Sequence, residues 1–153
     1  ARTHPGCALV RWWPAARCEQ MGAFFTDGDD VHVLTYTPRS RPDGHGIWDA
    51  DGRRVSFFLE YDTGTERPLS RLVDKLDGYA DLAKVVGRVW PVLFWLPNPV
   101  RERHLHRQLT DAGVRYPVAT AVHDTGNPAG PVWWLHRRPG GPLQLADLGQ
   151  HLG

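Results

Sequence analysis

Residues 46–62 read Gly46-Ile47-Trp48-Asp49-Ala50-Asp51-Gly52-Arg53-Arg54-Val55-Ser56-Phe57-Phe58-Leu59-Glu60-Tyr61-Asp62 and predict a β-hairpin. Asp51-Gly52 is a favoured two-residue turn, and residues 46–48 and 54–62 form the two arms. Side chains alternate along a strand, so the second arm turns one set toward a core and the other set away from it. The inward set is Val55, Phe57, Leu59 and Tyr61; the other is Ser56, Phe58, Glu60 and Asp62. We therefore expect both acids to emerge together at the end of this strand.

Helices and strands alternate after the hairpin. Pro68 is well placed to start a helix, and apolar residues then recur at helical spacing. These residues are Leu69, Leu72, Val73, Leu76, Tyr79, Ala80 and Ala83. Residues 92–96 form a continuous apolar run typical of a strand buried on both faces. A helix from Asn98 to Gly113 follows, and the remaining expected elements are a strand at 118–122, an edge strand at 132–135 and a C-terminal helix at 143–152.

The N-terminal third gives weaker signals. Residues 8–13 predict a short strand closed by Pro14, residues 15–25 a short helix or irregular turn that carries Glu19, and residues 31–36 a further strand. Together these elements predict one α/β domain over residues 1–153, with a mixed central β-sheet flanked by helices and at least one crossover connection.

Composition narrows the classes of function. The 153 residues carry a net charge of +1, so affinity for nucleic acid would have to come from local patches. No apolar run approaches the ~18 residues that a membrane-spanning helix needs, and we expect a cytoplasmic protein with no membrane partner. Cys7 and Cys18 match no zinc pattern and predict reduced thiols. Motifs for a serine hydrolase or a nucleotide-binding P-loop are absent from the sequence.

Carboxylates are the strongest chemical signal. Asp43 lies beside a turn, and Glu60 and Asp62 follow seventeen and nineteen residues later. Magnesium prefers such oxygen ligands, and Asp43 and Glu60 on neighbouring strands could supply them together with the Tyr61 carbonyl. Lys75 borders the apolar face of the helix that follows, in line with Tyr79 at i+4, so it could reach inward to support charge. The alternative is a common turn and a solvated strand end.

Three strings resemble the replication-relaxation family of actinobacterial and plasmid-borne proteins, and the likeness extends from about Trp12 to Leu148. They are Arg41-Pro42-Asp43-Gly44, Phe57-Phe58-Leu59-Glu60-Tyr61-Asp62-Thr63-Gly64-Thr65-Glu66 and Leu72-Val73-Asp74-Lys75-Leu76-Asp77-Gly78-Tyr79. The resemblance implies a role in plasmid replication, DNA relaxation or transfer. It also implies an upstream winged helix, and the start without an initiator Met leads us to expect the C-terminal part of a longer protein.

The same layout resembles the restriction-endonuclease-like PD-(D/E)xK fold. That resemblance matches Asp43 and Glu60 to the two acidic motifs, and Glu19 to a helix acid. Asp62 stands where the pattern normally has lysine. Two explanations stay open: the lysine has moved to Lys75 on the next helix, or the site is a catalytically inactive relic that binds DNA.

Basic and aromatic residues offer further contacts with nucleic acid. Arg101, Arg103 and Arg107 make the helix from Asn98 to Gly113 basic, and could lie along a phosphate backbone; a solvated amphipathic helix is the alternative. Two pairs, Trp12-Trp13 and Trp133-Trp134, could stack on bases, although such pairs more often place one ring in the core and one at the surface.

These observations predict a DNA-acting protein of plasmid replication or relaxation. We expect a Mg²⁺- or Mn²⁺-dependent endonuclease or nickase in which Asp43, Glu60 and Asp62 are the metal ligands. Lys75 stabilises charge in this interpretation. The alternative is an inactive DNA-binding or protein-interaction module on the same fold, or a dimerisation platform.

Overall fold

The computed structural model describes residues 6–64 and 68–151, which form one six-stranded mixed sheet. Its strands are β1 (Cys7–Pro14), β2 (Gly44–Ala50), β3 (Arg53–Tyr61), β4 (Val92–Leu96), β5 (Val118–Val122) and β6 (Trp134–Leu135). They lie side by side in chain order. β1, β2 and β3 pair antiparallel, β3, β4 and β5 pair parallel, and β6 returns antiparallel to β5. The predicted α/β class with a mixed sheet is confirmed.

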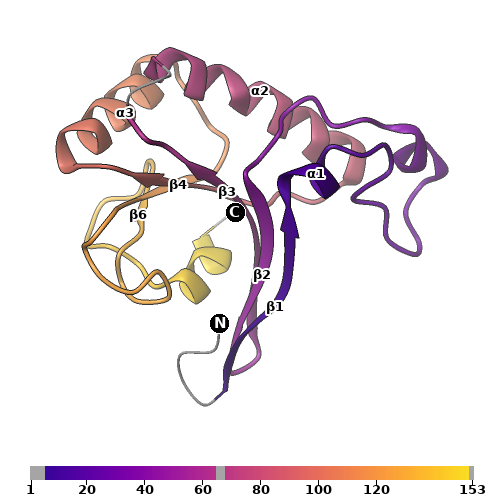
Figure 1. The fold of residues 1–153 in the computed structure, drawn as a ribbon, viewed down its shortest axis with the longest axis horizontal. Helices are drawn as coiled ribbons and strands as arrows, with labels where there is room; N and C mark the ends of the chain where they lie inside the picture. Colours follow the sequence, from indigo (N-terminus) through magenta and orange to yellow (C-terminus); the bar gives the residue numbers. More distant parts are fainter. Residues whose placement is uncertain (1–5, 65–67, 152–153) are drawn as a thin grey trace.

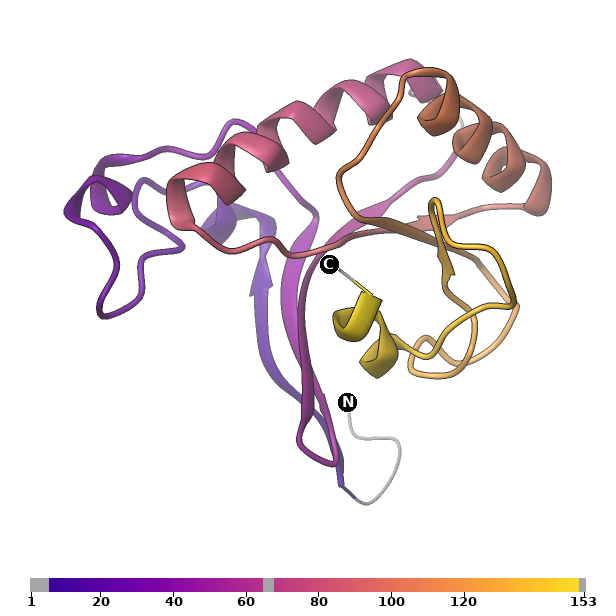
Figure 2. The same ribbon diagram turned by 180° about the vertical axis from the view of Figure 1, so that it is seen from behind.

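Two helices make the parallel crossovers. α2 (Leu69–Val86) connects β3 to β4, and α3 (Pro99–Asp111) connects β4 to β5. Figure 1 shows both helices on one side of the sheet, and Figure 2 shows the same arrangement from behind. The C-terminal 3₁₀ helix η2 (Leu145–His151) lies on the opposite side of the sheet.

The β2–β3 hairpin forms as the sequence predicts. Asp51 and Gly52 have φ values of 52° and 86°, the left-handed conformations that a tight turn between twisted strands requires. The register pairs Gly44 with Leu59 and Ala50 with Arg53. This register brings the start of β2 beside the end of β3, and therefore brings Asp43 close to Glu60 in space.

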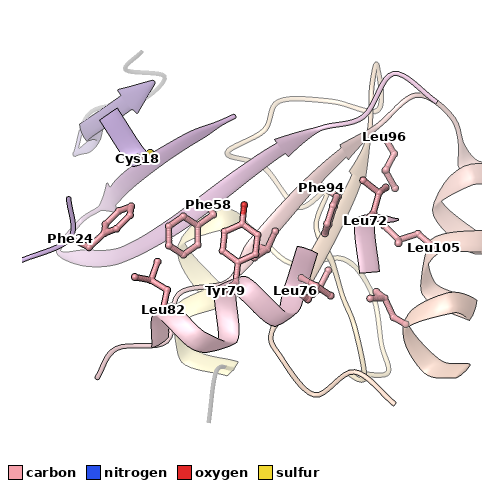
Figure 3. Packing of buried hydrophobic residues seen from close by; sticks show 13 residues of the cluster. Cys18, Phe24, Phe58, Leu72, Leu76, Tyr79, Leu82, Phe94, Leu96 and Leu105 are labelled. Carbon is pink, nitrogen blue, oxygen red and sulfur yellow. The ribbon is translucent and has the colours of Figure 1, made fainter. Parts of the chain in front are cut away.

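Each face of the sheet has its own core. Phe58, Tyr79 and Phe94 belong to the cluster between the sheet and the two helices, and Figure 3 shows how these rings pack with the leucines of α2. Val55, Phe57 and Trp133 belong to a second cluster, beneath η2 and the loops that precede it. β3 is therefore covered on both faces.

Because both faces of β3 are covered, the prediction about its two acidic side chains has to be corrected. Glu60 and Asp62 share a face as expected, but they do not emerge into solvent, because α2 and α3 cover that face. Their residues are only 1% and 5% exposed. Tyr61, assigned to the inward set, is instead half exposed at the strand's end.

Two of three further local predictions change. Residues 31–36 are not a strand, because Val31–Thr35 forms the 3₁₀ helix η1, whose N-cap Asp30 accepts a hydrogen bond from the His32 backbone N–H. Residues 15–25, predicted as a short helix or irregular turn, form the short helix α1 (Ala15–Cys18) followed by turns, in agreement with that prediction. The C-terminal helix is the 3₁₀ helix η2, and residue 152 of the predicted range lies outside the described residues.

None of the helices in the described ranges is long and apolar enough to cross a membrane.

Candidate active site

Asp43 lies immediately before β2 and is exposed. Its backbone N–H donates to the Leu59 carbonyl at 2.9 Å, which continues the β2–β3 ladder by one residue. Its carboxylate Oδ2 accepts a hydrogen bond from the Tyr61 backbone N–H at 2.6 Å. This second bond fixes the carboxylate at the end of β3, beside the residue that follows Glu60.

Glu60 is buried under two side chains of α2. Lys75 Nζ lies 2.8 Å from Oε1 and 2.7 Å from Oε2, and the Tyr79 hydroxyl donates to Oε2 at 2.5 Å. Lys75 and Tyr79 are four residues apart, so one face of the helix presents both groups to one carboxylate. The predicted inward reach of Lys75 is confirmed.

Burial and local charge set the proton affinity of this group. Burial raises the pKa of the Glu60 carboxyl, while the charge and hydrogen bond of Lys75 and the hydroxyl of Tyr79 oppose that rise. The nearby charge of Asp43 adds a smaller increase to the same pKa. Burial, with the Glu60 charge second, raises the pKa of Tyr79, so this hydroxyl keeps its proton and remains a donor. Asp43, Glu60 and Lys75 thus form one electrostatic unit.

The segment before Asp43 packs tightly against α2. Lys75 Nζ donates to the Arg41 carbonyl at 3.2 Å, and Ser40 Oγ donates to the Lys75 carbonyl at 2.5 Å. Gly78 permits this approach, because a Cβ there would lie 2.1 Å from Ser40 Oγ and 2.9 Å from the Ser40 backbone nitrogen. The glycine lets the segment lie on the helix, and so places Asp43 beside Lys75.

A cavity of about 410 Å³ opens over this group, with Arg39, Arg41, Asp43, Asp74 and Lys75 among its lining residues. A larger cavity of about 510 Å³ lies on the other face of the sheet and has no charged residue in its lining. A phosphodiester needs cationic and hydrogen-bonding groups, so the first of these two cavities suits it and the second does not.

Asp62 lies apart from this group. Its carboxylate pairs with Arg101 of α3 at 2.5 Å from Nε and 3.1 Å from the terminal guanidinium nitrogen, and also accepts from the Gly64 backbone N–H at 3.1 Å. The structure therefore brings together three of the four predicted catalytic residues, Asp43, Glu60 and Lys75. The fourth, Asp62, is in a buried ion pair.

Of the three arginines predicted to contact nucleic acid on α3, one is paired within the protein and two are free to face solvent. Arg101 is committed to Asp62, whereas Arg103 and Arg107 are exposed to solvent. Leu105 and Leu109 face the core, as an amphipathic helix requires. Each tryptophan pair places one ring inward, Trp13 and Trp133, and leaves Trp12 and Trp134 more exposed, in agreement with the commoner of the two sequence interpretations.

The chemistry of the donors decides whether a metal ion fits. No group of three or more His, Cys, Asp or Glu side chains suited to a metal ion occurs within residues 6–64 and 68–151. Magnesium, however, is often held by one or two carboxylates, with waters and substrate phosphate as the other ligands. Asp43 lines the cavity, and Glu60 lies buried beneath it as the partner of Lys75. The two carboxylates supply hard oxygen donors, and this donor set fits such an ion.

Three residues complete the site that were not among its predicted members. Tyr79 holds the Glu60 carboxylate in place through its hydroxyl. Ser40 bonds the segment before Asp43 to α2, and Gly78 leaves room on the helix for that contact. The spacing of Tyr79 four residues after Lys75 is a signal that could have identified it as a second partner of Glu60. Nothing in the sequence indicates the contact between Ser40 and Gly78, which are far apart in the chain.

The fold and site define an α/β domain with a buried carboxylate–lysine pair beside an exposed aspartate. The family model described as replication-relaxation matches residues 1–93, which include these three residues. The chain belongs to the replication-relaxation family. Comparisons with curated proteins and with solved structures found no match.

Proposed function

We propose that this domain is a metal-dependent DNA endonuclease or nickase that acts in plasmid replication or relaxation. The observation that carries the proposal is the contact of Lys75 with both oxygens of Glu60, beside Asp43 and below an open cavity. Membership of the replication-relaxation family supports DNA as the substrate. Acidic metal ligands and a nearby group that stabilises charge are components of metal-dependent phosphodiester cleavage.

Each residue has a distinct role in this proposal. Asp43 and Glu60 hold Mg²⁺ or Mn²⁺, which when bound polarises the scissile phosphate and lowers the pKa of a water. Lys75 stabilises negative charge that develops on the phosphate, and the Arg41 carbonyl orients its ammonium group. Tyr79 keeps the Glu60 carboxylate in a fixed orientation through its short hydrogen bond.

The position of Lys75 supports the restriction-endonuclease-like interpretation of the fold. A PD-(D/E)xK site has its lysine two residues after the second acid, where this chain has Asp62. Lys75 supplies an ammonium group to Glu60 from α2 instead. In this proposal Asp62 is a ligand of a second metal ion only after it leaves Arg101, and its present contact stabilises the end of β3.

An inactive DNA-binding module is the rival function, and one observation favours it. Both oxygens of Glu60 already have protein partners, and burial raises the pKa of this carboxyl. A carboxylate that serves only to connect β3 with α2 would look the same. The proposed homodimer and upstream winged helix remain predictions.

The metal requirement gives a test of the proposal. A labelled DNA duplex should be cleaved with Mg²⁺ or Mn²⁺ and not with EDTA. Asp43→Asn should raise the metal concentration needed for half-maximal cleavage by about 10–100-fold, because one anionic oxygen donor is lost. Asp49→Asn is the matched control, since Asp49 is paired with Arg54 on the hairpin and should be dispensable. A metal response that Asp43→Asn leaves unchanged would contradict the assignment of this ligand.

A further inference from the structure

A second set of cations lies on the edge of the sheet, next to the candidate active site. Arg11 and Arg17 place their guanidinium carbons 4.5 and 4.2 Å from the ring centroid of Trp13. Both arginines are exposed, and neither has a carboxylate within ion-pair distance in the described ranges 6–64 and 68–151. Cation–π contact limits the motion of each guanidinium while its N–H donors stay accessible.

The fold connects these arginines to Asp43. β1 is the edge strand, and its register pairs Trp13 with His45 and Pro14 with Gly44, the residue after Asp43. The Trp13 ring contacts His45 and Phe24 on the α2 side of the sheet, the side that also holds Glu60. Figure 1 shows α1, which carries Arg17, beside the end of β1 and the start of β2.

Arg41 extends the cationic surface to the cavity. Its side chain is exposed and lies 3.5 Å from Glu19 at the end of α1, so α1 and the segment before Asp43 are neighbours. Arg41 also lines the cavity over Asp43 and Lys75. Cationic side chains therefore follow one another from the sheet edge to the candidate metal ligands.

We propose that Arg11, Arg17 and Arg41 form a docking surface for the DNA phosphate backbone that leads a strand to Asp43 and Lys75. This inference rests on the proposed function, and places the main DNA contact at the β1 edge and not on α3. Charge complementarity supports DNA as the occupant, because a phosphate backbone carries regularly spaced negative charges and accepts hydrogen bonds from arginine. The α3 surface is the weaker candidate, because Arg101 is committed to Asp62 and no residue of α3 lines the cavity over Asp43, whereas Arg41 does.

The test measures binding without cleavage, so it does not depend on catalysis. Fluorescence anisotropy of a labelled duplex in EDTA should show that Arg11→Ala with Arg17→Ala weakens binding about tenfold or more. The slope of log K against log salt should flatten by about two units, since each lost phosphate contact removes about one. Arg103→Ala with Arg107→Ala removes the same charge from α3 and should leave most of the affinity.

Other outcomes would overturn the inference. Full affinity in the Arg11/Arg17 variant, with loss in the Arg103/Arg107 variant, would assign DNA to α3. Better competition by poly-glutamate than by unlabelled DNA, at equal charge concentration, would assign the surface to an acidic protein. Circular dichroism melts of each variant exclude unfolding as the cause. If the wild type binds DNA through Arg11 and Arg17 but does not cleave it, the docking surface would be supported and only the nuclease function would be contradicted.

Discussion

Lys75→Met should slow DNA cleavage by about 10²–10³-fold, the usual cost of removing one group that stabilises charge in the transition state. Methionine keeps the length and much of the volume of the lysine stem, so the packing of α2 on β3 is retained. The Glu60 carboxylate loses its cation but keeps the Tyr79 hydroxyl. Single-turnover rates on a labelled duplex at saturating Mg²⁺ would measure the effect.

Lys84→Met is the matched control for this substitution. Lys84 is the other lysine of the chain; it lies on the same helix and is exposed. Its replacement removes an equal charge from α2 and should leave the rate unchanged. A metal-dependent cleavage rate that survives Lys75→Met would show that Lys75 only neutralises Glu60 in the folded protein and has no part in catalysis.

Acid should destabilise the fold through its buried histidines, of which His45 and His106 have the largest lowering of the pKa. His45 is fully buried, its Nδ1 lies 3.0 Å from the Phe57 carbonyl oxygen, and its Nε2 has no partner in the described part of the chain. Nδ1 therefore carries the proton of the neutral ring. Burial lowers the pKa of His45 to about 4, with the charge of Arg11 as a smaller cause in the same direction.

His106 is buried as well, and so is the nearby His136, whose pKa burial also lowers. Thr120 Oγ1 donates to Glu102 at 2.6 Å, so it accepts from His106 Nε2 at 2.8 Å. The ring stacks on Trp134 at 3.5 Å between centroids, and burial lowers the pKa of His106 to about 4. A proton on its remaining nitrogen would place a charge in this buried network.

The direction of the pH effect follows from these values. Above the ordinary histidine pKa of 6.5 both states are neutral and stability is complete. As the pH falls from 6.5 toward 4, the unfolded chain binds protons that the folded chain does not. The free energy of unfolding should drop by about 2 kcal/mol for each of His45 and His106 between about pH 7.5 and pH 5.0. The raised pKa values of Glu60 and Glu102 act in the opposite direction, because acid relieves the cost of burying their charges.

Urea denaturation at the two pH values would isolate the contribution of His45. His45→Phe removes one hydrogen bond at every pH but also removes the titrating group, so its loss of stability on acidification should be about 2 kcal/mol smaller than that of the wild type. His104→Phe, at an exposed position of α3, should keep the wild-type pH dependence. An equal loss of unfolding free energy on acidification in His45→Phe and in the wild type would contradict the assignment of His45 as a neutral buried histidine.

Local sequence signals predicted the parts of the fold that depend on local geometry. Asp51-Gly52 identified the hairpin because its turn needs two left-handed residues, and the four-residue spacing from Lys75 to Tyr79 placed both on one face of α2. The strand predicted at residues 31–36 was wrong. Their β-branched content is typical of a strand, yet Val31 is 71% exposed and the segment pairs with no strand of the described sheet.

Contacts between distant residues could not be predicted. The pair of Asp62 with Arg101 joins residues 39 positions apart, and it decides that Asp62 does not share the cavity of Asp43. Likewise, the position of Arg11 beside the start of β2 depends on the register of β1, which includes an irregularity between Leu9 and Arg11. Neither composition nor periodicity contains this information.

Conversion of a supercoiled plasmid by the wild-type domain and by Glu60→Gln, with Mg²⁺ present, tests the central claim most directly. Glutamine has the size of glutamate and can still bond to Tyr79, but it lacks the negative charge that holds a metal ion. Open-circle or linear product with the wild type, lost in a folded Glu60→Gln variant, is the predicted result. Equal product from both proteins, or none from a wild type that binds the plasmid, would contradict a catalytic site at Asp43, Glu60 and Lys75.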